Sequence, residues 1–202
     1  MKNKMKKIVM DKSNLIECHN RIKPYIHNTP VITSTQINNM TGAEIYFKCD
    51  NFQKMGAFKM RGATNAILQL PENKKRNGVV THSSGNFGQA LALAAKSIGV
   101  KAYIVMPSNA PEIKKIAVKG YGGELIECES NVESREATAQ EIVKSKGATF
   151  IHPSNDNDVI LGQGTACKEL LEDYNCLEYV ITPVGGGGLS SGLVKYFDKK
   201  NT

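Results

Sequence analysis

The 202-residue sequence lacks any long apolar run and any regular cysteine pattern. No stretch approaches the roughly 20 apolar residues that cross a bilayer, and no apolar region follows the basic first seven residues as it would in a signal peptide. The five cysteines form no C-x-x-C pair, no histidine lies at a metal-ligand spacing from them, and their odd number argues against a complete disulfide framework. We therefore expect a reduced, cytoplasmic protein with no membrane segment and no metal site within this chain.

An arginine-rich stripe with interleaved aromatic residues is also missing. The formal net charge is +7, but part of it lies in a lysine cluster within the first seven residues, and the other lysines alternate with acids. We therefore expect no nucleic-acid partner. What is present is ordinary for a globular protein: 41% hydrophobic and 22% charged residues, in a length that suits one large or two small domains.

Strands and helices alternate regularly from Gly78 onward. Short apolar runs such as "GVVTHSS" and "KAYIVMP" are each followed by a helical pattern of about a dozen residues. This alternation predicts an α/β fold built from parallel β-α-β units. The expected strands are 78–84, 101–107, 124–128, 149–153 and 178–184, and the expected helices are 85–99, 109–122, 134–147, 164–174 and a last helix after the glycines at 185–188.

The first 77 residues show no such alternation. We expect a helix over 11–25, a short extended piece at 29–32 and a strand over 44–50. A second helix is expected over 58–68, followed by a polar, proline-containing loop over 69–77. No internal repeat and no low-complexity segment interrupts the chain.

Four consecutive glycines, Gly185 to Gly188, stand between a predicted strand and a predicted helix. Such a turn lets backbone N–H groups converge at a helix N-terminus, which favours phosphate binding, whereas a merely structural turn would not need so much backbone freedom. The loop is not a P-loop, because it continues as Gly188-Leu189-Ser190, whereas a P-loop ends in Gly-Lys-Ser or Gly-Lys-Thr. It is not the dinucleotide fingerprint of an oxidoreductase, because Ser191 stands in place of the third glycine.

A second polar loop, Ser83 to Gln89, also lies between a predicted strand and a predicted helix. It offers hydroxyls, an amide and open backbone donors at a helix N-terminus, which together suit a carboxylate. Ordinary helix capping by Ser84 or Asn86 is the alternative, but capping accounts for one of these residues and not for the whole cluster.

Lys59 stands between the small, flexible Met55–Ala57 turn and a segment that reads as a helix start. A surface lysine needs no such setting, whereas a lysine that loses its proton and forms a covalent bond does. Pyridoxal phosphate (PLP) needs a lysine for its aldehyde, a cradle for its phosphate and a site for the carboxylate of its amino-acid substrate. The lysine, the glycine loop and the polar loop therefore predict PLP chemistry.

Four ordered motifs resemble those of the fold-type II PLP enzymes. "QKMGAFKMRGA" is similar to their lysine motif, "SSGNFGQALA" to their substrate loop, "PVGGGGL" to their phosphate loop and "DVILGQGT" to a further family segment. The similarity runs in register from about Ile16 to Phe197 and is greatest to the serine racemases and the serine and threonine dehydratases. It implies two parallel-sheet domains, a small one at 78–153 inserted in a larger one formed by 1–77 and 154–202, whose C-terminal remainder is missing here.

The resemblance also implies a role for each motif. Lys59 would be the imine lysine and the base on one face of the substrate Cα, and Phe58 would pack beside the cofactor. Asn86 would hydrogen-bond the ring hydroxyl of the cofactor. The phosphate would be held by backbone N–H groups of Gly185, Gly186, Gly187, Gly188 and Leu189, and the substrate carboxylate would be received by Ser83, Ser84, Gly85, Asn86 and Phe87.

Ser84 stands where serine racemases carry serine and threonine dehydratases usually have alanine. A hydroxyl on the face opposite Lys59 would permit two-base racemisation beside elimination. Gln89 and Tyr121 match positions of the nucleotide-effector site of the racemases, which implies ATP as an effector. The missing C-terminal part would hold the group that bonds the pyridine nitrogen and an acidic cluster for Mg²⁺ or another divalent cation, and the family suggests a homodimer at full length.

The sequence thus predicts a PLP-dependent enzyme acting on small hydroxy amino acids. It would interconvert serine enantiomers, or act as an L-serine or L-threonine dehydratase that releases an oxo-acid and ammonia. The alternative is a truncated, catalytically inactive relative that serves as a small-ligand-binding or interaction module. Shortness of the chain favours that alternative, whereas an intact Lys59, Asn86 and glycine loop favour the enzyme.

Overall fold

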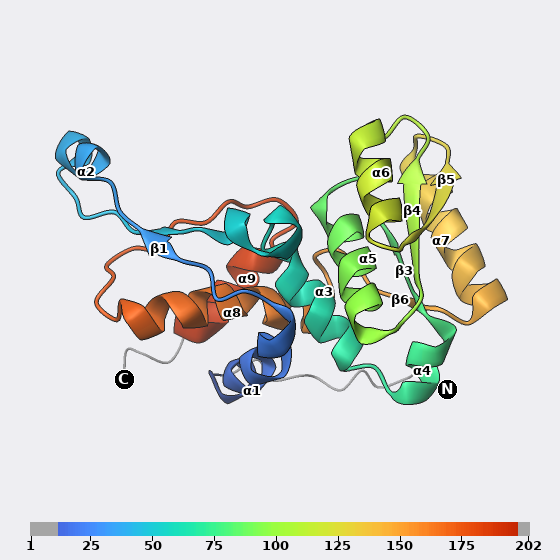
Figure 1. The fold of residues 1–202 in the computed structure, drawn as a ribbon, viewed down its shortest axis with the longest axis horizontal. Helices are drawn as coiled ribbons and strands as arrows, with labels where there is room; N and C mark the ends of the chain where they lie inside the picture. The colour runs from blue at the N-terminus through green and yellow to red at the C-terminus, as the bar shows by residue number, and fades with distance from the viewer. Residues whose placement is uncertain (1–11, 198–202) are drawn as a thin grey trace.

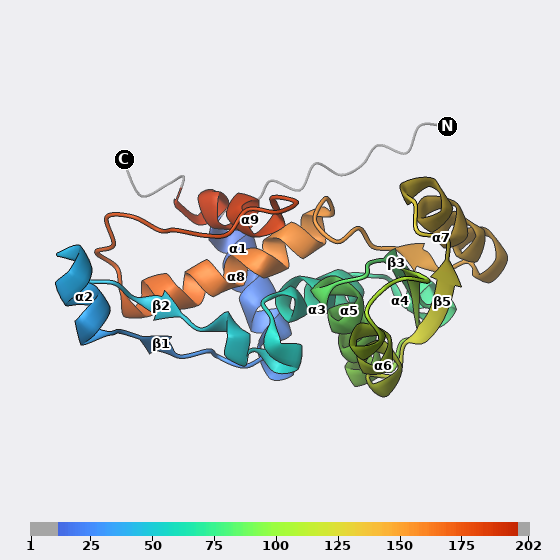
Figure 2. The ribbon, with the colours of Figure 1, turned by 90° about the horizontal axis from the view of Figure 1, so that it is seen from above.

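A computed structural model describes residues 12–197, which form two adjoining parts (Figure 1). One part is a parallel β-sheet with helices on both faces, and the other is mainly helical with a small two-stranded ribbon. Helix α3 (Lys59–Leu68) lies between the two parts, as the view from above shows (Figure 2). The predicted α/β class with a parallel sheet is confirmed.

The sheet has the strand order β5-β4-β3-β6, with every neighbouring pair parallel. The chain steps in one direction from β3 to β5 and then returns to β6 on the other side of β3. Because parallel crossovers are right-handed, this reversal places α7 on the face opposite α5 and α6, as Figure 1 shows. The elements are β3 (Val79–His82), α5 (Asn86–Ile98), β4 (Ala102–Pro107), α6 (Glu112–Gly120), β5 (Glu124–Cys128), α7 (Val132–Lys146) and β6 (Thr149–Phe150).

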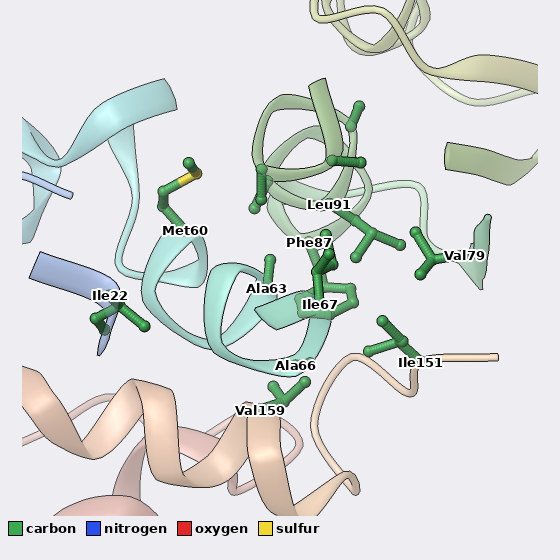
Figure 3. Packing of buried hydrophobic residues seen from close by; sticks show 14 of the residues in the cluster. Ile22, Met60, Ala63, Ala66, Ile67, Val79, Phe87, Leu91, Ile151 and Val159 are labelled. Carbon is green, nitrogen blue, oxygen red and sulfur yellow. The ribbon is translucent and has the colours of Figure 1, made fainter. Parts of the chain in front are cut away.

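Alternate residues of the central strands enter two different hydrophobic clusters, since successive side chains of a strand point to opposite faces. Val79 on β3 and Ile104 on β4 pack with α5 in the larger cluster, and their neighbours Val80 and Tyr103 pack with α7 in the smaller one. Figure 3 shows part of the larger cluster, which extends across α3 and into the helical part. The labelled residues are Ile22, Met60, Ala63, Ala66, Ile67, Val79, Phe87, Leu91, Ile151 and Val159.

The helical part surrounds α3 and α8. Helix α3 is buried on nearly all sides, from Met60 through Ile67, because it packs against both α5 and α8. The elements of this part are α1 (Lys12–Ile22), η1 (Lys23–Tyr25), β1 (Val31–Ile32), α2 (Thr35–Thr41), β2 (Phe47–Lys48), η2 (Asp50–Phe52), η3 (Lys54–Gly56), α8 (Asn157–Asp173) and α9 (Gly188–Phe197). A short α4 (Glu72–Asn77) connects α3 to the sheet.

Glycines set the close approach of α8 to its two neighbours. A Cβ added to Gly162 of α8 would lie 2.6 Å from the Cα of Gly62 on α3. Further along α8, a Cβ added to Gly164 would lie 2.8 Å from the carbonyl oxygen of Gly192 on α9. The three helices therefore touch backbone to backbone, which holds the first turn of α3 at a fixed place relative to α9.

Several predicted elements differ from the structure. The helix expected over 164–174 begins earlier, because α8 starts at Asn157. The strand expected over 44–50 is limited to β2, and the loop expected over 69–77 contains α4, which begins directly after Pro71. The strand expected over 178–184 is wrong: these residues form no β-ladder, and Tyr179 and Ile181 are 84% and 96% exposed. Among the described residues no second strand lies beside this segment to accept its backbone hydrogen bonds.

Candidate active site

Lys59 is the first residue of α3 and its amine is half-buried. Its Nζ donates a hydrogen bond to the carbonyl oxygen of Pro153 at 2.9 Å. The ring centroids of Phe58 and Phe87 lie 5.1 and 5.8 Å from the same nitrogen. Burial lowers the pKa of the Lys59 amine, so more of it is neutral than at an ordinary surface lysine. A neutral amine is the form that attacks an aldehyde.

The turn before Lys59 is clamped, although the sequence suggested a flexible one. Met55 and Gly56 both have positive φ, 58° and 78°. A left-handed conformation is strained for methionine and persists only where the surroundings impose it. The buried Gln53 supplies that constraint: its side-chain oxygen accepts from the backbone N–H groups of Lys54 and His27 at 3.0 and 2.8 Å, and its amide donates to the His27 carbonyl at 2.7 Å. The approach to Lys59 is therefore held by a fixed chain path.

Two loops meet at one edge of the sheet. Strands β3 and β6 are parallel neighbours, so their carboxyl ends lie side by side. Ser83 follows β3 and Pro153 follows shortly after β6. Lys59 contacts Pro153 and Phe87, which places its amine at this edge. Crevices outside the carboxyl ends of parallel strands are where open α/β sheets bind ligands.

The predicted substrate loop is partly engaged by its own surroundings. The Gly85 N–H donates to the Ser83 hydroxyl at 3.3 Å, and the exposed Asn86 accepts a hydrogen bond from Lys114 on α6 at 3.0 Å. Phe87 is 2% exposed and belongs to the larger hydrophobic cluster. The loop is therefore a defined turn at the start of α5, in which Phe87 contributes its backbone and the ring facing Lys59.

The predicted phosphate loop rests on the turn that Lys59 also contacts. A Cβ added to Gly186 would collide with the Ser154 hydroxyl, and one added to Gly188 would lie 3.2 Å from the Ser154 carbonyl oxygen. Gly187 has φ +77°, which favours glycine. Helix α9 begins at Gly188, so the loop lies at its N-terminus. Lys59 and the glycine loop thus contact adjacent residues, Pro153 and Ser154.

Sequence reasoning did not single out the 152–155 turn that joins these parts. The His152 ring nitrogen Nδ1 accepts from the backbone N–H groups of Ser154 and Asn155 at 3.2 and 2.8 Å, which fixes the turn. A signal was available, because the segment includes the carboxyl end of the strand predicted over 149–153, and ligands bind at the carboxyl ends of parallel strands. The two positions matched to a nucleotide site, Gln89 and Tyr121, lie on α5 and just after α6, and a nucleotide role for them stays a prediction.

A buried charge cluster lies two residues beyond Lys59. The Arg61 guanidinium is fully buried and donates to both oxygens of Asp50, at 2.8 and 2.9 Å, and to both oxygens of Glu169, at 2.7 and 2.8 Å. Burial alone would raise the pKa of each carboxyl, but hydrogen bonds from Arg61 hold the pKa of both below the usual range. Lys48 also contacts Glu169, at 2.7 Å. The cluster ties α3, α8 and the chain after β2 together.

Within residues 12–197, no group of three or more His, Cys, Asp or Glu side chains is arranged to hold a metal ion. In the same part of the chain, no helix combines the length and the apolar character needed to span a membrane.

Sequence and structure comparisons agree on the class of protein. Residues 22–202 match the sequence model of a family described as pyridoxal-phosphate dependent enzyme. The chain is 51% identical over 176 residues to a serine racemase of Dictyostelium discoideum, which covers 87% of this chain and 54% of that protein. It is 48% identical over 179 residues to a beta-hydroxyaspartate dehydratase of Paracoccus denitrificans, covering 89% and 57%.

Solved structures give the same result. The maize serine racemase structure superposes with a TM-score of 0.92 at 46% identity, covering 95% of this chain and 58% of that one. The processed form of threonine deaminase isoform 2 from Solanum lycopersicum superposes with a TM-score of 0.86 at 31% identity, covering 95% and 54%. The chain spans about half the length of the curated relatives that it matches.

The α/β fold with its parallel sheet is that of a fold-type II enzyme. The chain belongs to the family of pyridoxal-phosphate dependent enzymes.

Proposed function

We propose that this chain is the part of a PLP-dependent enzyme that carries the cofactor lysine and acts on serine, threonine or a similar hydroxy amino acid. The reaction would be racemisation of serine or elimination of water to give an oxo-acid and ammonia. The observation that carries the proposal is the Lys59 amine, half-buried, lowered in pKa and resting on Pro153 beside the glycine loop. The names of the relatives, serine racemase, beta-hydroxyaspartate dehydratase and threonine deaminase, support this substrate class.

The residues at the sheet edge fit the cofactor. The glycine loop lies at a helix N-terminus and its glycines carry no side chains of their own, which suits a phosphate group. When bound, PLP supplies an electron sink for charge that develops at the substrate Cα. Lys59 would hold the cofactor through its aldehyde, and the Lys59 amine, whenever it is free of the cofactor, would be placed to take or return the Cα proton on one face. Phe58 and Phe87 would shield that amine from water, which keeps its neutral form favoured.

The substrate-loop residues would receive the other end of the substrate. Ser83, Ser84 and the N–H groups at the start of α5 lie at a helix N-terminus, where a carboxylate is stabilised. On contacting the cofactor ring hydroxyl, Asn86 would either lose its hydrogen bond from Lys114 or keep that bond beside the new one. Gly185, Gly186, Gly187, Gly188 and Leu189 would hold the phosphate.

Replacing Lys59 by alanine is expected to abolish covalent attachment of PLP to the chain. The parent chain, mixed with PLP and reduced with borohydride, should carry one cofactor on the peptide that contains Lys59, located by mass spectrometry. A Lys54→Ala variant is the matched control, since Lys54 lies five positions earlier in the same segment. Equal labelling of the parent and the Lys59→Ala variant would sink the proposal and leave the ligand-binding module as the better interpretation.

Ser84→Ala is expected to separate the two reactions. If Ser84 handles the proton on the face opposite Lys59, its loss should reduce racemisation by about 10²-fold or more, the usual contribution of an acid–base group, and leave elimination within a few-fold. Chiral chromatography of serine and a coupled oxo-acid assay measure both rates on the whole enzyme. Ser83→Ala is the neighbouring control. A parallel loss of both activities would argue against this role.

The remaining assignments extend the same proposal. Residues 78–153 would form the small domain and residues 1–77 and 154–202 would belong to the larger one. We also propose a cytoplasmic homodimer that responds to Mg²⁺ or another divalent cation, bound outside this chain, and to ATP at Gln89 and Tyr121. Light scattering on the whole enzyme measures the oligomeric state. Turnover with and without each effector tests the regulation, and Gln89→Ala tests the position of the ATP site. Turnover that is unchanged by either effector would remove the regulatory part.

A further inference from the structure

A polar pocket lies between the end of α1, the following η1 turn and the last turns of α8, outside all of the residues assigned to PLP above. Its volume is about 210 Å³, room for a small ion or metabolite together with some water. It is lined by His19, Asn20, Lys23, Ile26, Asn28, Lys168, Glu169 and Glu172.

His19 is the buried member of this lining that lacks a partner. The residue is 7% exposed, yet its Nδ1 has no hydrogen-bond partner among the described residues. The nearest acid, Glu169, is 3.7 Å from that nitrogen, which is too long for a hydrogen bond. A buried polar atom without a partner costs stability, and such atoms are rare in native structures. His19 thus lines the pocket and has one buried ring nitrogen without a hydrogen-bond partner in the described part of the chain.

The acids of the pocket are already occupied. Glu169 accepts from Arg61 with both oxygens, at 2.7 and 2.8 Å, and from Lys48 at 2.7 Å. Glu172 accepts from Lys168 at 2.6 Å. Both acids are therefore already paired with cations of this chain.

The donors of the pocket are in excess. Lys23 takes part in no ion pair within residues 12–197. An ammonium carries three donors, so Lys168 retains two after its contact with Glu172. Asn20 and Asn28 add side-chain amides. A lining with spare N–H donors and satisfied acids is complementary to a ligand that brings acceptors.

We propose that this pocket is a binding site for a small oxyanion, either a phosphate or a dicarboxylate. Lys23 and Lys168 supply the charge, and the His19 ring and the two asparagine amides supply directional hydrogen bonds. The Glu172 side chain is 56% exposed, so it can turn to solvent and release Lys168 to the anion. The Lys168 side chain is only 9% exposed, so the anion would have to replace Glu172 as the partner of its ammonium.

Histidine-ring NMR reports on this site directly, because the chain has four histidines and only His19 lines the pocket. Inorganic phosphate, titrated at constant ionic strength and pH, should move the His19 ring signals along a saturable curve, with His19→Gln identifying those signals. Lys23→Met and Lys168→Met should each weaken the apparent affinity by about tenfold, the loss expected for one charge-assisted hydrogen bond. Lys101→Met, which removes an exposed lysine on the sheet, is the matched control and should leave the curve unchanged.

Succinate in place of phosphate decides between the two ligand classes, according to which of them saturates the His19 shift at lower concentration. The proposal fails if sodium chloride moves the His19 signals as much as either anion does. It fails equally if both lysine variants titrate like the parent chain. Phosphate that binds at the glycine loop is distinguished from phosphate in this pocket by the Lys23→Met variant. If phosphate bound only at the glycine loop, the His19 titration curve would be the same in the parent chain and in Lys23→Met.

Discussion

Replacing Arg61 by methionine is expected to lower the free energy of unfolding by about 3–5 kcal/mol, the usual cost of removing one partner from a buried ionic cluster. Arg61 is fully buried and donates four hydrogen bonds to Asp50 and Glu169. Methionine fills similar space but leaves both carboxylates without their main partner. Lys48 would still neutralise part of the Glu169 charge, so most of the lost stability should come from the Asp50 carboxylate that is left without Arg61.

Chemical denaturation followed by far-ultraviolet circular dichroism measures this effect. Arg61→Lys keeps the charge but cannot contact both carboxylates with parallel pairs of donors. Its free energy of unfolding should therefore lie between those of the parent and Arg61→Met. Lys101→Met is the control for losing an exposed pair, that of Lys101 with Glu124, and should change stability by less than about 1 kcal/mol. If Arg61→Met were as stable as Lys101→Met, the cluster would not hold α3 in place.

Gly162→Ala is expected to destabilise the chain by about 3 kcal/mol, at the upper end for overpacking. The new methyl group would lie 2.6 Å from the Gly62 Cα and 2.7 Å from the Arg61 carbonyl oxygen. Both contacts are with backbone, which cannot turn aside as a side chain can. Helices α3 and α8 would have to separate, and the first turn of α3, with Lys59, would move with them.

Gly120→Ala is a matched control, because Gly120 also lies in a helix and a Cβ there meets nothing within 4 Å. Alanine has the higher helix propensity, so this variant should be neutral or slightly more stable. Thermal unfolding of the two variants under the same conditions makes the comparison. A Gly162→Ala chain that unfolds at the temperature of Gly120→Ala would show that α3 and α8 do not need glycine contact.

Periodicity predicted the sheet part well because its signals are local. Gly99 ends α5 in the left-handed conformation, and Pro111 precedes the first turn of α6, as such residues usually do. The segment 102–107 is buried on both faces of a parallel sheet and so reads as a continuous apolar run. Lys59 and the glycine loop could be proposed as site residues from local signals too. The lysine lies just after a small turn, the four glycines are consecutive, and each stands at or directly before the start of a predicted helix.

Long-range features could not be read in this way. An apolar run such as 178–184 has the composition of a buried strand, but a strand exists only where another strand accepts its hydrogen bonds. Nothing near Arg61 in the sequence indicates that Glu169 would reach it. The contact of Gly186 with Ser154 likewise depends on how α8 and α9 pack, which no local pattern encodes.

The sequence separation of these contacts has a consequence for biosynthesis. Arg61 and Glu169 are 108 positions apart, and Lys59 and Pro153 are 94 apart. At roughly 5–20 residues per second, a ribosome needs about 5 to 20 seconds to add the chain between Arg61 and its second carboxylate. During that interval α3 has no α8 to pack against, so nascent chains that stop before α8 should be cleaved readily within α3 by added protease. The lysine segment is therefore made early and packs against its last large neighbour late, when α8 leaves the ribosome.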